Sequence, residues 1–403
     1  MSTSVLYHGW GVRGYVYERS EFVEGGLVFH LRQKAGLRCP VCRSAQVIGR
    51  GTVERRFKTV PVGLKPVTLV LPVQRVECHV CHAVRQVEVQ FADARRTYTK
   101  AFERYAVDLC RVATILDAAR HLGVSWDTVK EIEKRYLKRA FGAPPLRDLR
   151  AIAIDELYLG RTGKFLTIVL DLEGGAIVHV GEGKGDEALQ PFWKKLRRAG
   201  AAIEAVAMDM SPAYAAAVAE HLPQAALIFD HFHVIKLFNQ KLTDLRRDLY
   251  HEATAKLQKQ VLKGTRWLLL KRPDHLDPAK DEAQRLHEAL ALNQTLATAY
   301  YLREEFSEFW NQPDKASAAS FLQDWINRAF TTGVRILHDI AKSLAGHRSG
   351  LLAYYDFKLT TAKLEGTNRK IRTLLCRAYG YRDKEFLTLK LYALHCSKYA
   401  LVG

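Results

Sequence analysis

The sequence has no long apolar run. No stretch approaches the roughly eighteen consecutive apolar residues that a membrane span needs, and the first residues, MSTSVLYHGWGVRGY, lack the apolar core of a signal peptide. We therefore expect a cytoplasmic protein with no membrane partner. Seven cysteines in that compartment argue against a disulfide framework and favour metal ligation or burial.

Acidic residues are also scarce relative to basic ones. Asp and Glu number 43 against 61 Lys and Arg, which gives a formal charge of +18. An excess of this size is typical of proteins that bind phosphates, so we expect a nucleic-acid partner. A protein with a solvated basic face is the plainer alternative. The 403 residues exceed what one compact core usually carries, so we expect two or three domains.

Four of the cysteines form two C-x-x-C pairs, CPVC and CHVC. Two such turns can present four thiolates to one tetrahedral Zn²⁺. The intervening stretch KPVTLVLPVQRVEC alternates apolar residues as a strand does. His79 and His82 are possible substitute ligands, and four unrelated buried thiols are the alternative. The pattern predicts a zinc ribbon-like, β-rich domain over residues 1–95. The predicted zinc ligands are Cys39, Cys42, Cys78 and Cys81.

The next segment, ILDAARHLGVSWDTVKEIEKRYLKRA, has the periodicity of two helices. Gly123 can make the turn between them, and Ser125 can cap the second helix. This pattern predicts a helix-turn-helix within residues 96–148, whose second helix would enter a DNA major groove. An ordinary helical hairpin is the alternative. The predicted DNA contacts on the second helix are Lys130 and Arg135.

From Arg150 onward the pattern changes to short β-rich segments separated by glycine turns. Three such strands are followed by helix, strand, helix and strand, an order that predicts a mixed sheet flanked by helices. The ribonuclease H fold is the prominent small fold that begins in this way. About a hundred residues after Asp230 have helical periodicity and predict an inserted helical domain. The predicted parts are a catalytic core over 149–250, an all-α insertion over 251–355, and the final helices of the core over 356–403.

Two acids, Asp155 and Asp209, close two of the predicted strands, 151–155 and 203–209. If the strands are neighbours, their carboxylates converge and repel each other unless they share a cation. Hard oxygen ligands beside a phosphate substrate favour Mg²⁺ or Mn²⁺. Phosphodiester cleavage is well served by two such ions, about 4 Å apart and held by two or three carboxylates. The two acids are therefore candidate metal ligands.

Glu365 is the candidate third carboxylate. It is a lone acid in the cationic stretch KLEGTNRKIR. On a helix, Asn368, Arg369 and Arg372 share its side, so the acid would face metal while its neighbours contact DNA phosphates. The alternative is a surface salt bridge with Arg369, which is worth under about 1 kcal/mol. Spacing alone favours the salt bridge.

Three long stretches favour the metal-binding role. AIDELYLGRTGKFLTIVLDLEGG, AMDMSPAYAAAVAEHLPQAALIFDHFHVIK and KLEGTNRKIRTLLCRAYGYRD resemble the ISL-three family of insertion-sequence transposases. The resemblance covers almost the whole chain, including the order of cysteine pairs and helix-turn-helix. It implies a ribonuclease H-like catalytic domain with a DDE-type acidic triad, interrupted by a helical insertion. The implied triad is Asp155, Asp209 and Glu365.

The resemblance also implies further roles. Arg372 stands where related transposases carry a basic residue that contacts the transposon end. The DHFH stretch matches a signature shared by several such families, which makes Asp230 and His233 supporting residues. Glu156 is a possible rival ligand, but alternation along a strand points it to the opposite face. Trp267, Trp310 and Trp325 lie in the predicted insertion, where some relatives stack a tryptophan on a displaced base, and core packing is the role assigned to each.

The implied function is that of a DDE transposase of a bacterial insertion sequence. Such a protein binds double-stranded DNA at terminal inverted repeats, then cleaves and joins DNA with Mg²⁺ or Mn²⁺, while Zn²⁺ is structural. A homodimer or higher oligomer is expected because two ends must be held together, and the nucleoid is the expected location. The alternatives are a catalytically inactive, transposase-derived repressor and a junction-resolving nuclease of the same fold.

Overall fold

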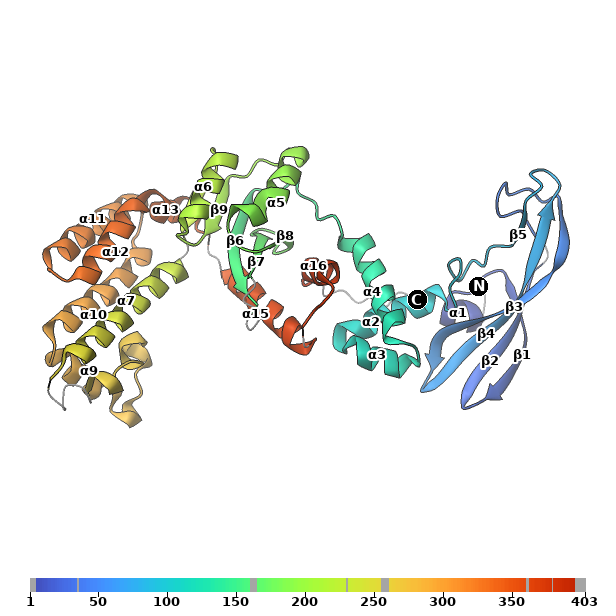
Figure 1. Cartoon of the computed structure of the whole chain (residues 1–403), viewed down its shortest axis with the longest axis horizontal. Coiled ribbons are helices and arrows are strands. Elements are labelled where there is room, and N and C mark those ends of the chain that lie inside the picture. Colours follow the sequence, from blue (N-terminus) through green and yellow to red (C-terminus); the bar gives the residue numbers. More distant parts are fainter. Residues whose placement is uncertain are drawn as a thin grey trace. The chain divides into compact units, whose positions relative to one another are not determined.

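The structure is a computed structural model of the chain, and it describes residues 5–34, 36–159, 165–229, 231–254, 261–359, 362–378 and 380–395. The chain forms two compact units (Figure 1). Unit 1 consists of Met1–Ala143 together with Leu375–Gly403, and unit 2 is Pro144–Leu374. The segment 356–403, expected to lie with the catalytic core, therefore divides between the two units.

The first part of unit 1 is a β-sheet built around a strand with the predicted alternation. Val67, Leu69 and Leu71 of this strand, β4, are buried and form a core with residues of the neighbouring strands. The strand order is β1-β2-β4-β3, with β5 paired to β4. The elements are α1 (Val5–Trp10), β1 (Tyr15–Val23), β2 (Gly26–Gln33), β3 (Val47–Val62), β4 (Lys65–Cys78) and β5 (Val84–Gln86).

The second part of unit 1 is the predicted helix-turn-helix, formed by α3 (Ile115–Leu122) and α4 (Trp126–Phe141) and supported by α2 (Lys100–Val112). Gly123 ends α3 in the left-handed conformation at φ 59°, where glycine avoids a steric cost. The Ser125 side chain accepts the backbone N–H of Thr128 at 3.2 Å and caps α4. Both the turn and the cap are as predicted.

The C-terminal helix α16 (Lys384–Tyr392) packs on α4 within unit 1. Phe386 and Leu389 of α16 are buried against Leu137 of α4. Beside them, the Lys390 ammonium lies 2.6 Å from the carboxylate of Glu133, which is 3% exposed. Burial raises the pKa of Glu133, and Lys390 opposes that rise. The last helix therefore supplies both apolar surface and a counter-charge to the core of the helix-turn-helix.

Unit 2 is built on a five-stranded mixed sheet in the order β10-β9-β6-β7-β8. β6, β7 and β8 are antiparallel neighbours, and β9 and β10 continue the sheet in parallel with β6. This arrangement confirms the predicted fold class. The strands are β6 (Ala151–Tyr158), β7 (Phe165–Asp171), β8 (Ile177–Glu182), β9 (Ala205–Met208) and β10 (Ala226–Phe229), and the crossover helices are α5 (Asp186–Ala199) and α6 (Pro212–His221).

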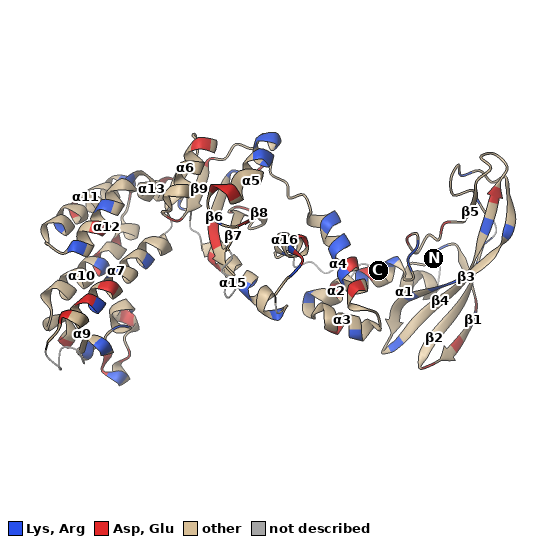
Figure 2. Cartoon of the chain, in the orientation of Figure 1, with Lys and Arg blue, Asp and Glu red and all other residues tan. Residues whose placement is uncertain are grey.

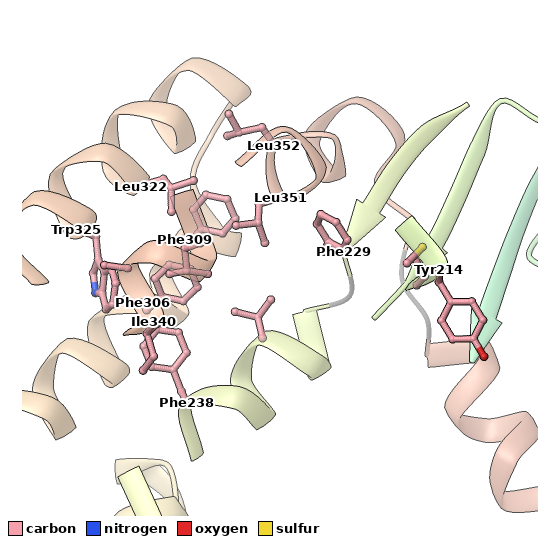
Figure 3. Packing of buried hydrophobic residues seen from close by; sticks show 14 of the residues in the cluster. Tyr214, Phe229, Phe238, Phe306, Phe309, Leu322, Trp325, Ile340, Leu351 and Leu352 are labelled. Carbon is pink, nitrogen blue, oxygen red and sulfur yellow. The ribbon is translucent and has the colours of Figure 1, made fainter. Parts of the chain in front are cut away.

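A helical region follows β10, and its buried residues form one continuous cluster with those of the sheet. Figure 3 shows Phe229 of β10 facing Leu351 of α13, with Phe306, Phe309 and Trp325 packed further into the helices. The helices are α7 (His231–Glu252), α9 (Glu282–Ala291), α10 (Gln294–Phe306), α11 (Lys315–Thr331), α12 (Arg335–Gly346), α13 (Arg348–Leu352), α14 (Tyr354–Phe357) and the returning α15 (Ala362–Arg377). Short 3-10 turns lie at Leu268–Leu270, Pro273–His275, Pro278–Lys280 and Ser307–Asn311.

The three tryptophans assigned to the core differ in environment. Trp325 is fully buried and donates its indole N–H to the Leu302 carbonyl at 2.9 Å, and Trp310 packs against the same cluster. Trp267 is 65% exposed, so its assignment to the core was wrong. The Arg266 guanidinium lies over its ring, 4.7 Å from the centroid. In the parts of the chain that the structure describes, no helix is long and apolar enough to cross a membrane.

We predict that Lys390→Ala destabilises unit 1 by about 3 kcal/mol, because it leaves the buried Glu133 carboxylate without its counter-charge. Adding Glu133→Gln should recover most of the loss. Chemical denaturation followed by circular dichroism measures both variants. Lys138→Ala is the matched control, because its pair with Glu385 is largely exposed and contributes little. Equal effects of Lys390→Ala and Lys138→Ala would contradict the prediction.

We predict that Gly350→Ala weakens the packing of the helical region on the sheet. A Cβ at residue 350 would lie 2.3 Å from the Phe229 ring. Because overpacking of this kind typically costs about 1–3 kcal/mol, the melting temperature should fall. Gly346→Ala is the control, since a Cβ there meets no atom within 4 Å. A Gly350→Ala protein as stable as the Gly346→Ala protein would refute the close approach.

Candidate active site and zinc site

The four predicted zinc ligands come together at one end of the β-rich part of unit 1. Cys39 Sγ lies 3.5 Å from Cys81 Sγ, and Cys42 Sγ lies 3.4 Å from Cys78 Sγ. All four sulfur atoms are within 4.8 Å of one another. With Zn–S bonds of about 2.3 Å, a tetrahedral site needs sulfurs about 3.8 Å apart, so this set fits a structural Zn²⁺.

The two cysteine turns have matching backbone geometry. The N–H of the residue after each pair, Arg43 or His82, donates to the carbonyl of the first cysteine at 2.9 and 3.0 Å. Both residues have positive φ, 63° and 56°. Backbone N–H donation, above all from Cys42, lowers the pKa of Cys39 to about 6. His82 therefore shapes a turn, and the ligand set comprises the four cysteines.

The first two acids of the predicted triad lie at the same level on neighbouring strands. β6 pairs in parallel with β9 through Ala153 and Ala207 as the last partners. Asp155 and Asp209 each follow that pair by two residues, so they share a level and a face of the sheet. Asp155 was expected to end its strand. It does not, because β6 continues along β7 to Tyr158. It does lie beyond the last residue of β6 that pairs with β9.

Asp155 is held by donors on both of its oxygens. The N–H of Glu156 donates to Oδ1 at 2.7 Å, and the Asn368 side-chain amide donates to Oδ2 at 2.6 Å. Burial raises the pKa of Asp155, and the nearby charge of Asp209 acts in the same direction. His233, the Glu156 N–H and Asn368 oppose the rise. The carboxyl group is thus desolvated and close to a second acid, which is an environment that favours a bound cation.

Asp209 lies where β9 passes into α6. Its Oδ1 accepts the N–H of Ser211 at 3.1 Å, and Ser211 precedes the first residue of α6. The carboxylate is therefore fixed by the same turn that starts the helix. Figure 2 shows the acidic stretch of β6 in the sheet of unit 2.

Glu365 lies in the first turn of α15, and this helix is attached to the sheet on both sides of it. Before Glu365, the Lys363 ammonium donates to the Leu172 carbonyl at 2.6 Å. After it comes Asn368, the partner of Asp155. The helix that carries the third predicted acid thus runs beside the strand that carries the first (Figure 1).

The three acids do not by themselves form a compact ligand group. Among the residues that the structure describes, the four cysteines are the one group of three or more His, Cys, Asp or Glu side chains close enough to hold an ion. Asp230, predicted as a supporting residue, lies outside the described residues. His233 lies in the first turn of α7 and is close enough to Asp155 to affect its pKa.

Glu156 points away from Asp155, as alternation predicts. Its Oε1 accepts the Tyr214 hydroxyl of α6 at 2.8 Å. The same hydroxyl group is 3.0 Å from Thr167 Oγ1 and accepts the Gly185 N–H at 3.0 Å. Glu156 is therefore part of a polar network on the α6 face of the sheet. Tyr214 was not predicted as a site residue, and Asn368 was expected to face DNA phosphates, whereas its amide bonds to Asp155. Only the fold brings each of the two to its distant partner.

The cations predicted to contact DNA fall into two groups. On α4, the Lys130 ammonium lies 3.0 Å from Asp383, and Arg135 pairs with Glu103. Lys134 also pairs with Asp383, at 2.9 Å, so acids of unit 1 already neutralise part of this helix. On α15, Arg369 and Arg372 are exposed.

With this geometry in place, comparisons with known proteins define the class. A transposase profile of the ISL3 family matches residues 152–391, and a profile of the helix-turn-helix domain of that family matches residues 87–137. A third profile, the zinc finger of the IS204, IS1001, IS1096 and IS1165 transposases, matches residues 36–81. The three parts of the fold are thus those of an insertion-sequence transposase, in the same order along the chain.

Individual relatives belong to the same class, the insertion-sequence transposases. The chain is 31% identical to the transposase for insertion sequence element IS1001 of Bordetella parapertussis, over 96% of both chains. It is 26% identical to the transposase for element IS1557 of Mycobacterium tuberculosis, over 87% of this chain and 84% of the relative. Among solved structures, the Drosophila P element transposase strand transfer complex matches at a TM-score of 0.39 and 14% identity, covering 76% of this chain and 94% of that one. The chain belongs to the ISL3 family of transposases.

We predict that Cys78→Ser removes the structural zinc, about one ion per chain, and lowers the stability of the β-rich part of unit 1. Metal analysis of the purified protein measures the first effect, and limited proteolysis the second. Cys376→Ser is the control, because Cys376 is exposed on α15. Full zinc content in Cys78→Ser would remove that residue from the ligand set.

Proposed function

We propose that this transposase binds the terminal inverted repeats of its insertion sequence and catalyses metal-dependent DNA cleavage and strand transfer. Asp155, Asp209 and Glu365 are its catalytic carboxylates. The observation that carries the proposal is the shared level of Asp155 and Asp209, together with the bond from the Glu365 helix to Asp155. The three predicted acids thus lie on β6, directly after β9 and on α15. β9 pairs with β6, and α15 is bonded to β6.

The carboxylate groups of the three acids are suited to binding Mg²⁺ or Mn²⁺. Carboxylate oxygens are the ligands that these hard cations prefer. Burial and the proximity of Asp209 make the ionised form of Asp155 costly without a positive partner. When bound, such ions supply an activated oxygen nucleophile and neutralise the charge of the phosphate and the leaving oxygen.

The chain's own residues orient the site and the DNA. The Glu156 N–H and Asn368 fix Asp155, and the α6 turn fixes Asp209. Arg369 and Arg372, exposed on the helix of Glu365, are placed to contact phosphates of the DNA end. We further propose Asp230 and His233 as supporting residues.

Recognition of the DNA ends is proposed for unit 1, which contains the zinc site and the helix-turn-helix. We propose that Lys130 and Arg135 contact phosphates once their acidic partners are exchanged for DNA. A homodimer or higher oligomer is proposed, because two ends must be held in one complex. The competing candidate is an inactive repressor derived from a transposase, which would bind ends and leave them uncut.

We predict that Asp155→Asn, Asp209→Asn and Glu365→Gln each reduce end cleavage by at least about 1,000-fold, because each removes charge stabilisation worth several kcal/mol. End binding should change little, because unit 1 is untouched. Cleavage and joining of a labelled duplex bearing the element's own end, with Mg²⁺ or Mn²⁺, measure activity, and gel shift measures binding.

The control for these variants is Glu173→Gln, an exposed acid in the turn between β7 and β8. It should cleave at the wild-type rate. A triad variant that also cuts at the wild-type rate removes that residue from the catalytic set. Tight end binding without cleavage by the wild type, with both ends and target DNA supplied, favours the repressor.

A further inference from the structure

The side-chain amide of Asn368 forms a hydrogen bond through its nitrogen, while its oxygen is buried without a partner among the described residues. Its Nδ2 donates to Asp155 Oδ2 at 2.6 Å. Its Oδ1 is buried and has no hydrogen-bond partner among the described residues. A buried amide oxygen in that state is costly, so such groups in native proteins usually have a partner or a functional reason.

The orientation of this amide is determined by chemistry. An ionised carboxylate only accepts hydrogen bonds, so the NH₂ group must face Asp155 and the oxygen must point elsewhere. Flipping the amide would place two oxygens against each other and lose the bond. The buried Oδ1 is therefore a consequence of holding Asp155.

Asn368 also determines where the Glu365 helix lies. Lys363 contacts the turn that follows β7 and Asn368 contacts β6, and the two residues are five positions apart, which is about 7.5 Å along a helix axis. Glu365 lies between them, one turn before Asn368 and on a neighbouring part of the same face. Loss of the Asn368 bond would leave Lys363 as the remaining one of these two polar attachments.

We propose that Asn368 is a positioning residue of the active site, which orients Asp155 through Nδ2 and holds the helix of Glu365 against β6. The inference rests on the proposed catalytic role of Asp155. Asn368 acts through Asp155, so it affects how well the carboxylates bind a divalent cation. It is an addition to the acidic triad, on the same helix as its third member.

The test measures cation binding without DNA as well as cleavage. In Asn368→Ala, we expect Mn²⁺ affinity, measured by electron paramagnetic resonance of free Mn²⁺, to fall by at least about tenfold, as is typical for partners that orient metal ligands. The end-cleavage rate should fall by a similar or larger factor, and more Mn²⁺ should be needed for half-maximal activity. The melting temperature without metal should change by only a few degrees, because the bond is a single polar contact.

A second variant separates orientation from ligation. Asn368→Asp keeps the size of the side chain, but it cannot donate to Asp155 at neutral pH and places a like charge against it. If Nδ2 donation is what matters, Asn368→Asp should bind Mn²⁺ no better than Asn368→Ala does. Wild-type Mn²⁺ affinity in Asn368→Asp would overturn the donor role.

Thr373→Ala is the matched control on the same helix, because its exposed hydroxyl bonds only to the helix carbonyl of Arg369 at 3.1 Å. It should leave the Mn²⁺ affinity and the end-cleavage rate unchanged.

Asp155→Asn distinguishes the two proposals. If Asp155→Asn is inactive while Asn368→Ala matches the wild type in affinity and rate, the positioning role fails and the catalytic triad stands. If Asp155→Asn itself cleaves normally, the proposed function fails first.

Discussion

The parallel pairing of β6 with β9 is the constraint on which the candidate site depends. Ile152 of β6 and Val206 and Met208 of β9 are fully buried, and this apolar packing fixes the register of the two strands. A slip of one residue would turn Asp155 toward α6. A slip of two would keep the face but separate the carboxylates by about 6.6 Å along the strands. The site is therefore a product of core packing as much as of its acids.

Charge in this protein is organised locally, and the total of +18 does not show where DNA would bind. Lysines of α4 are paired with Asp383 and Glu385, which lie at the start of the last helix. The arginines of α15 that follow Glu365 are exposed instead. Asp155 and Asp209 bring two negative charges close together, which disfavours the ionised form of Asp155. The N–H groups of Glu156 and Asn368 donate to Asp155 and favour its ionised form. The two environments are opposite in charge, because α15 exposes arginine side chains, whereas the pairing of β6 with β9 brings two carboxylates together.

Sequence reasoning succeeded where the signal is local. The alternation in β4, the cap and turn of the helix-turn-helix, the cysteine pairs and the succession of strands and helices in unit 2 all follow from neighbours in the chain. It failed where the partner is distant. Asp155 continues its strand because β7 pairs with it, and the partners of Lys130 and Asn368 lie over two hundred residues away. Trp267 was assigned to the core together with Trp310 and Trp325, and only the fold leaves it exposed. The catalytic role of the acids themselves stays a prediction.

Unit 1 is assembled from two segments that lie far apart in the sequence. Its sheet and helix-turn-helix precede unit 2 in the chain, while α16, which buries Phe386 and Leu389 and balances Glu133, follows unit 2. Glu133 and its partner Lys390 are 257 residues apart with the whole of unit 2 between them, so the core of the helix-turn-helix is completed only after unit 2 has been synthesised. A chain that stops early retains all three acids and both cysteine pairs, yet it lacks the helix that completes its DNA-binding core. The folding of unit 1 therefore depends on residues on both sides of unit 2.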